Sequence, residues 1–233
     1  MNTSIIKMSN AYESMDFDKL VDEGLFTIDF RSVQGTRCYL DDEAKKLVKY
    51  GIADTCLEGV HFIDSGNYHY LSLLYLMRIQ KKFDLLLVDN HPDMKSPSFG
   101  NITSCGGWVL EAMETLPNLG SVYMIGVKQE LIDELEPLPK QIKVIKSIDE
   151  IEAGDALYLS IDKDALCEKY AVTDWDQGGM TLDYLVDIIN GVIKKRQIIG
   201  ADICGDTSEP TELSNSINLT TNKALLDCLT EAF

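Results

Sequence analysis

Short apolar runs alternate with longer segments of helical character along almost the whole chain. Runs that stop at polar turns predict strands at 25–31, 59–64, 84–89, 121–127, 141–145, 156–162 and 198–203. Between them, caps and one-sided apolar positions predict helices at 43–50, 69–80, 107–114, 129–135, from 181 onward, and at 219–229. Residues 1–20 carry weak periodicity and are expected to form a short edge element. This alternation is typical of a parallel sheet with helices on both faces.

Composition narrows the class of protein without naming a function. The chain has 233 residues, 45% of them apolar and 25% charged, which favours one soluble domain spanning residues 1–233. No long apolar run and no basic-plus-apolar leader is present, so neither a membrane span nor export is expected. The six cysteines form no CxxC pair and are expected to be reduced thiols in a cytoplasmic protein. A net charge of −17 argues against a nucleic-acid partner and is compatible with bound metal or a cationic substrate.

The most informative stretch is the polar end of the strand at 84–89. The apolar run Leu85–Val88 stops at the sequence Asp-Asn-His-Pro-Asp, so Asp89, His91 and Asp93 stand at alternate positions. Alternate residues of a chain that leaves a strand point to the same side. Asp89 and Asp93 can therefore flank one metal ion while His91 reaches a neighbouring ion. Sites in open α/β sheets are built at such carboxyl ends.

Two other strand ends supply the same kinds of ligand. His69 follows the strand at 59–64, and Asp162 and Asp164 close the strand at 156–162. The set contains only nitrogen and oxygen donors, which suits two Mn²⁺ or similar ions better than a structural Zn²⁺ site. Two ions about 3.5–4 Å apart activate water near neutral pH. The residues alone thus indicate a metal-assisted hydrolase that acts on a small-molecule substrate.

Several motifs carry a resemblance to a known family. Asp89–Asp93 resembles the DxHxD motif of the arginase/agmatinase (ureohydrolase) family, and Ser160–Asp164 resembles its SxDxD motif. The segment 64–70 is similar to the GGDHS segment that supplies the first histidine. Gly178–Thr181 resembles the family's GGLT, and Gly200–Ile203 resembles its late strand. The match is ordered and spans roughly residues 59 to 206, in a chain shorter than typical members.

The resemblance implies a three-layer α/β/α fold of the arginase/deacetylase type, a mainly parallel sheet and two Mn²⁺ ions. It also implies hydrolysis of a linear C–N bond in a guanidino, amidino or formimino compound, and often a homo-oligomer. By this resemblance, one ion would be held by His69, Asp89, Asp93 and Asp162. The second ion would be held by Asp89, His91, Asp162 and Asp164, so the two ions would share Asp89 and Asp162.

Two departures from the family pattern concern catalysis. Cys105 stands where the family carries a histidine that is thought to shuttle protons, which makes Cys105 a candidate catalytic residue. The family's acid that grips the guanidinium falls at Gly205, and Asp206, one residue on, is the candidate to replace it through a backbone bulge. Two alternatives therefore remain: a single-metal, deacetylase-like amide hydrolase, and a metal-binding relative without catalytic activity.

Overall fold

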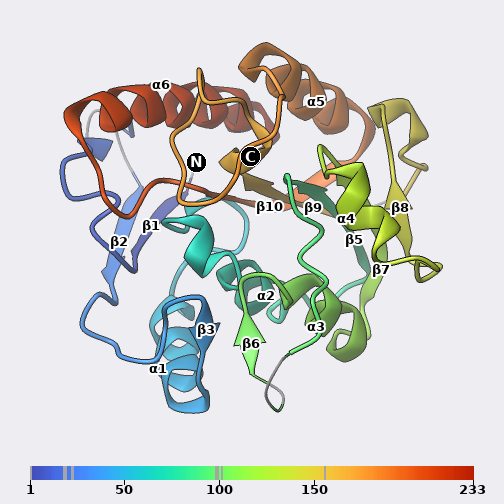
Figure 1. The fold of residues 1–233 in the computed structure, drawn as a ribbon, viewed down its shortest axis with the longest axis horizontal. Helices are drawn as coiled ribbons and strands as arrows, with labels where there is room; N and C mark the ends of the chain where they lie inside the picture. The colour runs from blue at the N-terminus through green and yellow to red at the C-terminus, as the bar shows by residue number, and fades with distance from the viewer. Residues whose placement is uncertain (1, 18–19, 22–23, 98–99, 101, 155) are drawn as a thin grey trace.

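The chain is described here by a computed structural model that covers residues 2–17, 20–21, 24–97, 100, 102–154 and 156–233. Its centre is an eight-stranded sheet in the order β2-β1-β4-β10-β9-β5-β7-β8, in which every neighbouring pair is parallel (Figure 1). The strands are β1 (Thr3–Lys7), β2 (Leu25–Asp29), β4 (Val60–Phe62), β5 (Phe83–Val88), β7 (Leu119–Ile125), β8 (Ile142–Val144), β9 (Ala156–Asp162) and β10 (Gln197–Cys204).

Helices cover both faces of this sheet. In Figure 1, α5 and α6 lie above it, while α1, α2 and α3 lie below. A separate antiparallel pair joins β3 to β6. These elements are α1 (Asp42–Ile52), α2 (Leu71–Leu76), α3 (Trp108–Thr115), α4 (Gln129–Asp133), α5 (Leu182–Lys195), α6 (Glu212–Leu229), β3 (Tyr39–Leu40) and β6 (Thr103–Ser104).

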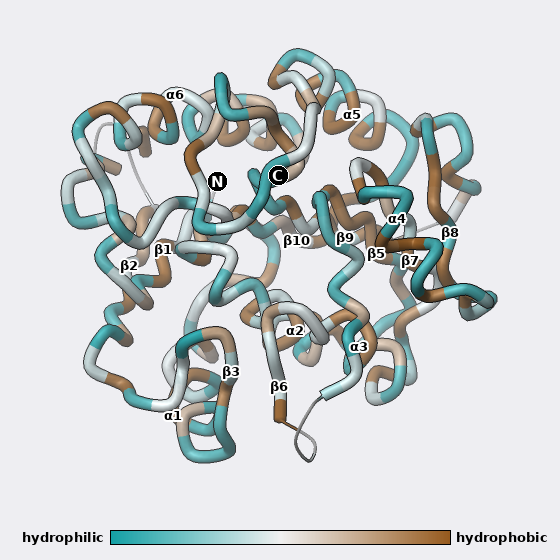
Figure 2. The backbone as a smooth tube through the Cα atoms, in the orientation of Figure 1, coloured by the Kyte–Doolittle hydropathy of each residue, from teal (hydrophilic) through white to brown (hydrophobic). Residues whose placement is uncertain are grey.

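The sheet separates two hydrophobic cores, and alternate strand residues enter opposite ones. In β5, Leu85 and Leu87 pack in the core with α1, α2 and α3, whereas Leu86 and Val88 pack in the core with α5 and α6. A strand buried on both faces needs a continuous apolar run, and Figure 2 shows such hydrophobic stretches along the central strands. The predicted α/β fold, with three layers and a parallel sheet, is confirmed.

Local signals placed several helix boundaries correctly. The Asp41 carboxylate accepts hydrogen bonds from the backbone N–H groups of Glu43 and Ala44, and Thr181 caps α5 through the N–H of Tyr184. The last helix begins earlier than predicted, at Glu212 rather than at 219. The prediction missed this start because the first two turns are mostly polar and their Leu213 is exposed.

The prediction for the amino-terminal residues was wrong in one respect. Residues 3–7 form β1, which lies between β2 and β4 and is therefore inside the sheet rather than at its edge. Ile5 and Ile6 are buried in opposite cores. Parallel pairing on both sides satisfies the backbone of this strand, which its short and weakly patterned sequence could not indicate. Of the predicted element at 1–20, residues 1, 18 and 19 lie outside the described part of the chain.

The topology brings four strand ends together. Strands β4, β10, β9 and β5 are consecutive neighbours, and all four run in the same direction. Their carboxyl ends therefore form one continuous edge, which is where polar residues of the predicted site leave the strands. Among the described residues, no helix combines the length and apolar character needed to cross a membrane.

Candidate metal centre

His69 lies at the middle of a group of carboxylates. It follows a short 3₁₀ turn, Gly66–Tyr68, which carries the chain from β4 into the site. Its Nδ1 atom lies 3.0 Å from Asp93 Oδ2, 3.2 Å from Asp89 Oδ2 and 3.5 Å from Asp162 Oδ2. One ring nitrogen of His69 thus faces three carboxylates that come from two strand ends.

His91 occupies a second, adjoining position. Its Nδ1 atom lies 2.9 Å from Asp164 Oδ2 and 3.5 Å from Asp89 Oδ1. The ligand atoms of Asp89, His91 and Asp164 form one compact group, and those of His69, Asp89 and Asp93 form another. Asp89 belongs to both groups and presents one oxygen to each histidine. The structure therefore brings all six predicted ligands together, over 95 positions of sequence from His69 to Asp164.

A buried oxygen that accepts no hydrogen bond supports the fit of a cation here. The Oδ2 atom of Asp89 is buried and lies 3.2 Å from His69 Nδ1 without a hydrogen bond. Burial raises the pKa of Asp89, and the neighbouring charge of Asp93 raises it further. A buried carboxylate oxygen that accepts no hydrogen bond is costly, and a divalent ion between these oxygens would remove that cost. The residues present thus fit a hard or borderline divalent ion.

The charged side chains around His91 also shift one another's pKa values. Burial and the neighbouring charge of Asp89 raise the pKa of Asp164 to about 7. Burial lowers the pKa of His91, but its hydrogen bonds to Asp164 and Asp89 outweigh this and raise the pKa to about 11. Without an ion, protons on these groups balance the negative charge. An ion that binds must displace them.

Each histidine is held by a hydrogen bond at its other nitrogen. The Nε2 atom of His69 lies 2.9 Å from the Ser160 hydroxyl, which donates to Asp202 over 2.7 Å. The Nε2 atom of His91 lies 2.9 Å from Asp176 Oδ1. Such partners fix the ring orientation and the tautomer that a metal ligand needs. The sequence motifs contained Ser160, but gave no signal that Asp202 or Asp176 would support the ligands.

A tryptophan orients one of the carboxylates. The indole Nε1 of Trp108 donates a hydrogen bond of 2.6 Å to Asp93 Oδ2, and the Trp108 side chain is fully buried at the start of α3. Asp93 itself has a positive φ of 49°, and the same oxygen lies 3.0 Å from His69 Nδ1. Sequence reasoning missed Trp108, since 15 positions separate it from Asp93.

The six candidate ligands line a cavity of about 450 Å³, within the usual range for small-molecule sites. Trp175 lines this cavity and is 40% exposed. Beyond the ligands, Lys95 and Glu134 are the charged residues that line it in the described part of the chain. The cavity therefore offers both a cation and an anion near its walls.

Cys105 lines the same cavity beside a second thiol, Cys38. The backbone N–H of Cys105 donates to the carbonyl of Cys38 over 2.9 Å, and the Cys38 thiol donates to Asn67 Oδ1 over 3.1 Å. The interaction between the two thiols, together with burial, raises the pKa of Cys105, while the same interaction lowers the pKa of Cys38 to about 7. Sequence reasoning selected Cys105 and missed Cys38, which directly precedes β3, the strand that pairs with β6 next to Cys105.

Asp206 takes a different position from the one expected. It is fully buried, and its Oδ2 atom pairs with Lys163 Nζ at 2.7 Å instead of lining the cavity. Gly205 has a φ of +90°, and a Cβ there would lie 2.3 Å from Asp162 Oδ1. Gly205 thus adopts a left-handed conformation just after the end of β10, and the chain directs Asp206 toward Lys163 and Asn222 of α6. The structure therefore does not support the predicted contact between Asp206 and a substrate in the cavity.

Fold and site together define a layered, parallel α/β protein with a candidate metal centre of two histidines and four carboxylates at the sheet edge. The chain belongs to the arginase family, whose sequence profile matches residues 3–206. It is also 30% identical over 178 residues to an uncharacterized protein of Thermotoga maritima, an alignment that covers 72% of this chain and 68% of the other.

Solved structures share the fold at low identity. Proclavaminate amidino hydrolase from Streptomyces clavuligerus superposes with a TM-score of 0.72 at 12% identity and covers 100% of this chain and 92% of its own. Formimidoylglutamase from Bacillus subtilis has a TM-score of 0.65 at 12% identity, covering 99% and 86%. Agmatine ureohydrolase of Thermoplasma volcanium has a TM-score of 0.64 at 16% identity, covering 98% and 90%.

Proposed function

We propose that this chain is a hydrolase with two divalent metal ions, of manganese type, that cleaves a linear C–N bond in a small guanidino, amidino or formimino compound. The observation that carries the proposal is the position of Asp89. Its two oxygens face His69 and His91 from distances of 3.2 and 3.5 Å, and it belongs to both ligand groups. A single ion could be held by only one of these two ligand groups, which would leave the other without a bound ion.

Different residues of the chain would hold each of the two ions. His69 and Asp93 would hold one ion, His91 and Asp164 the other, and Asp89 and Asp162 would lie between them. When bound, such ions supply Lewis acidity and a water of lowered pKa. Proton exchange near neutral pH fits Cys38, whose pKa is lowered to about 7, better than Cys105, whose pKa is raised.

The substrate class rests on the cavity and on the relatives. A volume of about 450 Å³ accepts a small molecule, and Lys95 and Glu134 can each pair with a substrate group of opposite charge. Gly205 offers no carboxylate where the family's guanidinium-gripping acid aligns, so the proposal includes less basic amidino and formimino compounds. The solved relatives include an amidino hydrolase and a formimidoylglutamase, whose names describe such compounds.

The test combines ion counting with turnover. The purified chain is loaded with Mn²⁺, its bound ions are counted, and the release of ammonia, urea or formamide is measured across a panel of guanidino, amidino and formimino compounds. We expect about two ions per chain and turnover of at least one compound. Asp89→Asn should lose both properties, whereas Asp187→Asn, at an exposed position of α5, should keep them.

Other results would replace the proposal. Fewer than about one ion per chain after loading would remove the metal centre itself. A single ion with amide hydrolysis would favour the deacetylase-like alternative. Two ions without turnover of any compound would favour a metal-binding relative that lacks catalytic activity.

A further inference from the structure

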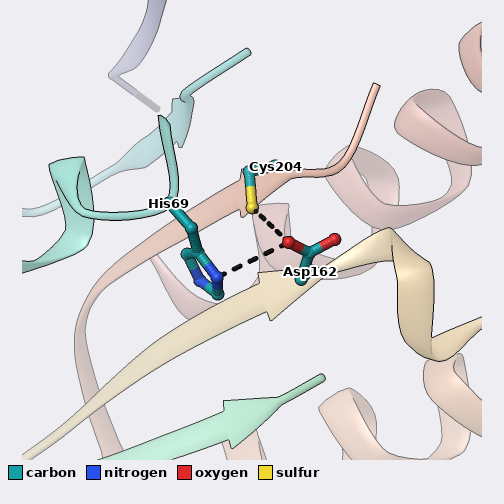
Figure 3. A group of neighbouring side chains, drawn as sticks. All are labelled: His69, Asp162 and Cys204. Atoms are coloured by element: carbon teal, nitrogen blue, oxygen red, sulfur yellow. Dashed lines mark hydrogen bonds and ion pairs between the residues drawn. The ribbon is translucent and has the colours of Figure 1, made fainter. Parts of the chain in front are cut away.

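A third ligand group of the same region contains a sulfur atom. Cys204 is the last residue of β10, and in the parallel pairing of β10 with β9 it is the register partner of Asp162. Its side chain is fully buried. The Sγ atom lies 3.0 Å from Asp162 Oδ2, the same oxygen that faces His69 Nδ1 (Figure 3).

The three side chains have the geometry of a ligand set. One nitrogen of His69, one oxygen of Asp162 and the sulfur of Cys204 all lie within 4.8 Å of one another. Figure 3 shows the Cys204 thiol, at the end of β10, and the His69 imidazole, on the turn after Gly66–Tyr68, both directed at one oxygen of Asp162. Tetrahedral ligands at Zn–S and Zn–N distances stand about 3.6 Å apart, so small side-chain shifts suffice for one ion to reach all three.

An independent observation points to a ligand at this place. Asp89 Oδ2, which lies 3.2 Å from the same nitrogen of His69, is buried and has no hydrogen-bond partner. One small region is therefore surrounded by an imidazole nitrogen, a thiol and two carboxylate oxygens, one of which accepts no hydrogen bond. The other cysteines near the centre, Cys38 and Cys105, line the cavity and belong to no ligand group among the described residues.

We propose that Cys204 supplies a thiolate ligand to the ion held by His69 and Asp162. This inference rests on the proposed metal centre and changes its chemistry. When the ion binds, the thiol loses its proton to solvent and its hydrogen bond to Asp162 is replaced by a metal–sulfur bond. Thiolate is a softer ligand than carboxylate, so the His69 side selects Zn²⁺, Co²⁺ or Fe²⁺ over Mn²⁺. The His91 side has only nitrogen and oxygen donors and keeps the preference for harder ions.

Cobalt substitution tests the bond directly, because a thiolate bound to Co²⁺ gives a charge-transfer band in the near ultraviolet. The full chain is loaded with Co²⁺, its bound ions are counted, and the spectrum is recorded. The matched control is Cys228→Ala, a buried cysteine of α6 whose thiol donates to Asn190. We expect the band in the unchanged chain and in this control, and its loss in Cys204→Ala and in Cys204→Ser.

Cys204→Ser guards against a folding defect, since its hydroxyl keeps the shape and the hydrogen bond to Asp162; circular dichroism checks the fold. In competition, its preference for Zn²⁺ over Mn²⁺ should fall at least about tenfold. Two bound cobalt ions without the band, or a band that persists in Cys204→Ala, would overturn the inference while the metal centre stands. No bound cobalt would overturn both. The band with no turnover would support the inference and leave the proposed function refuted.

Discussion

Lys163 Nζ lies 2.7 Å from Asp206 Oδ2, and both side chains are fully buried. The same ammonium group donates to Asn222 of α6 over 2.8 Å. Lys163 stands between two predicted metal ligands, Asp162 and Asp164, but the alternation of side chains turns it to the opposite side. A residue that interrupts the ligand motif in the sequence thus fastens the end of β9 to α6.

Breaking this pair is expected to destabilise the protein strongly. Lys163→Met would leave Asp206 buried without a cation, which costs about 3–5 kcal/mol of unfolding free energy. The double variant Lys163→Met/Asp206→Leu should recover most of that loss, because it removes the unpaired charge as well. Urea denaturation measures both. Equal stability of the single variant and the unchanged chain would contradict the pairing.

Adding a side chain at Gly205 is expected to damage the metal centre. A Cβ there meets Asp162 Oδ1 at 2.3 Å and requires a non-glycine residue at a φ of +90°. Gly205→Ala should lower the unfolding free energy by about 1–3 kcal/mol and weaken ion binding, because Asp162 must move. Gly179→Ala, where a Cβ meets nothing within 4 Å, is the control. Restoring an acid by Gly205→Glu should likewise disrupt the site rather than repair it.

Removing the support of His69 is expected to weaken ion binding without removing a ligand. Ser160→Ala deletes the hydroxyl that contacts His69 Nε2 and Asp202. Loss of such a partner typically costs about 10–100-fold in metal affinity. Isothermal titration calorimetry with Mn²⁺ gives the affinity. Ser216→Ala, on the exposed side of α6, serves as the control. An unchanged affinity in Ser160→Ala would refute this role.

Ion binding is expected to strengthen as the pH rises. The pKa of Asp164 is raised from 3.8 to about 7, so above pH 3.8 the unfolded chain loses this proton while the native metal-free chain retains it. The unfolding free energy of the metal-free chain therefore falls as the pH rises toward 7. His91 acts in the same direction: its pKa is raised from 6.5 to about 11, and its stabilising proton is lost as the pH rises.

Divalent ions take the place of these protons, so the stabilisation that bound ions give should grow as the pH rises. The increase in melting temperature caused by Mn²⁺ should be larger at about pH 8 than at about pH 6. Thermal unfolding with and without Mn²⁺ at both values measures this. An equal or larger increase at the lower pH would show that protons do not compete with the ion.

The sequence by itself determined the fold class and the six candidate nitrogen and oxygen ligands. Both follow from local order: a buried parallel strand must be a continuous apolar run, and residues at alternate positions after it must share a side, as Asp89, His91 and Asp93 do. Because parallel strands end at one edge, ligands from different strands were expected to meet there.

Only the tertiary structure decided the surroundings of those ligands. The pairing of Asp206 with Lys163, the contact of Cys204 with Asp162 and the hydrogen bond from Trp108 to Asp93 depend on strand register and helix packing. Cys204 and Asp162 are 42 positions apart and meet because β10 lies beside β9 in one register. A shift by one residue would direct the thiol into the opposite core, and no local pattern fixes that choice.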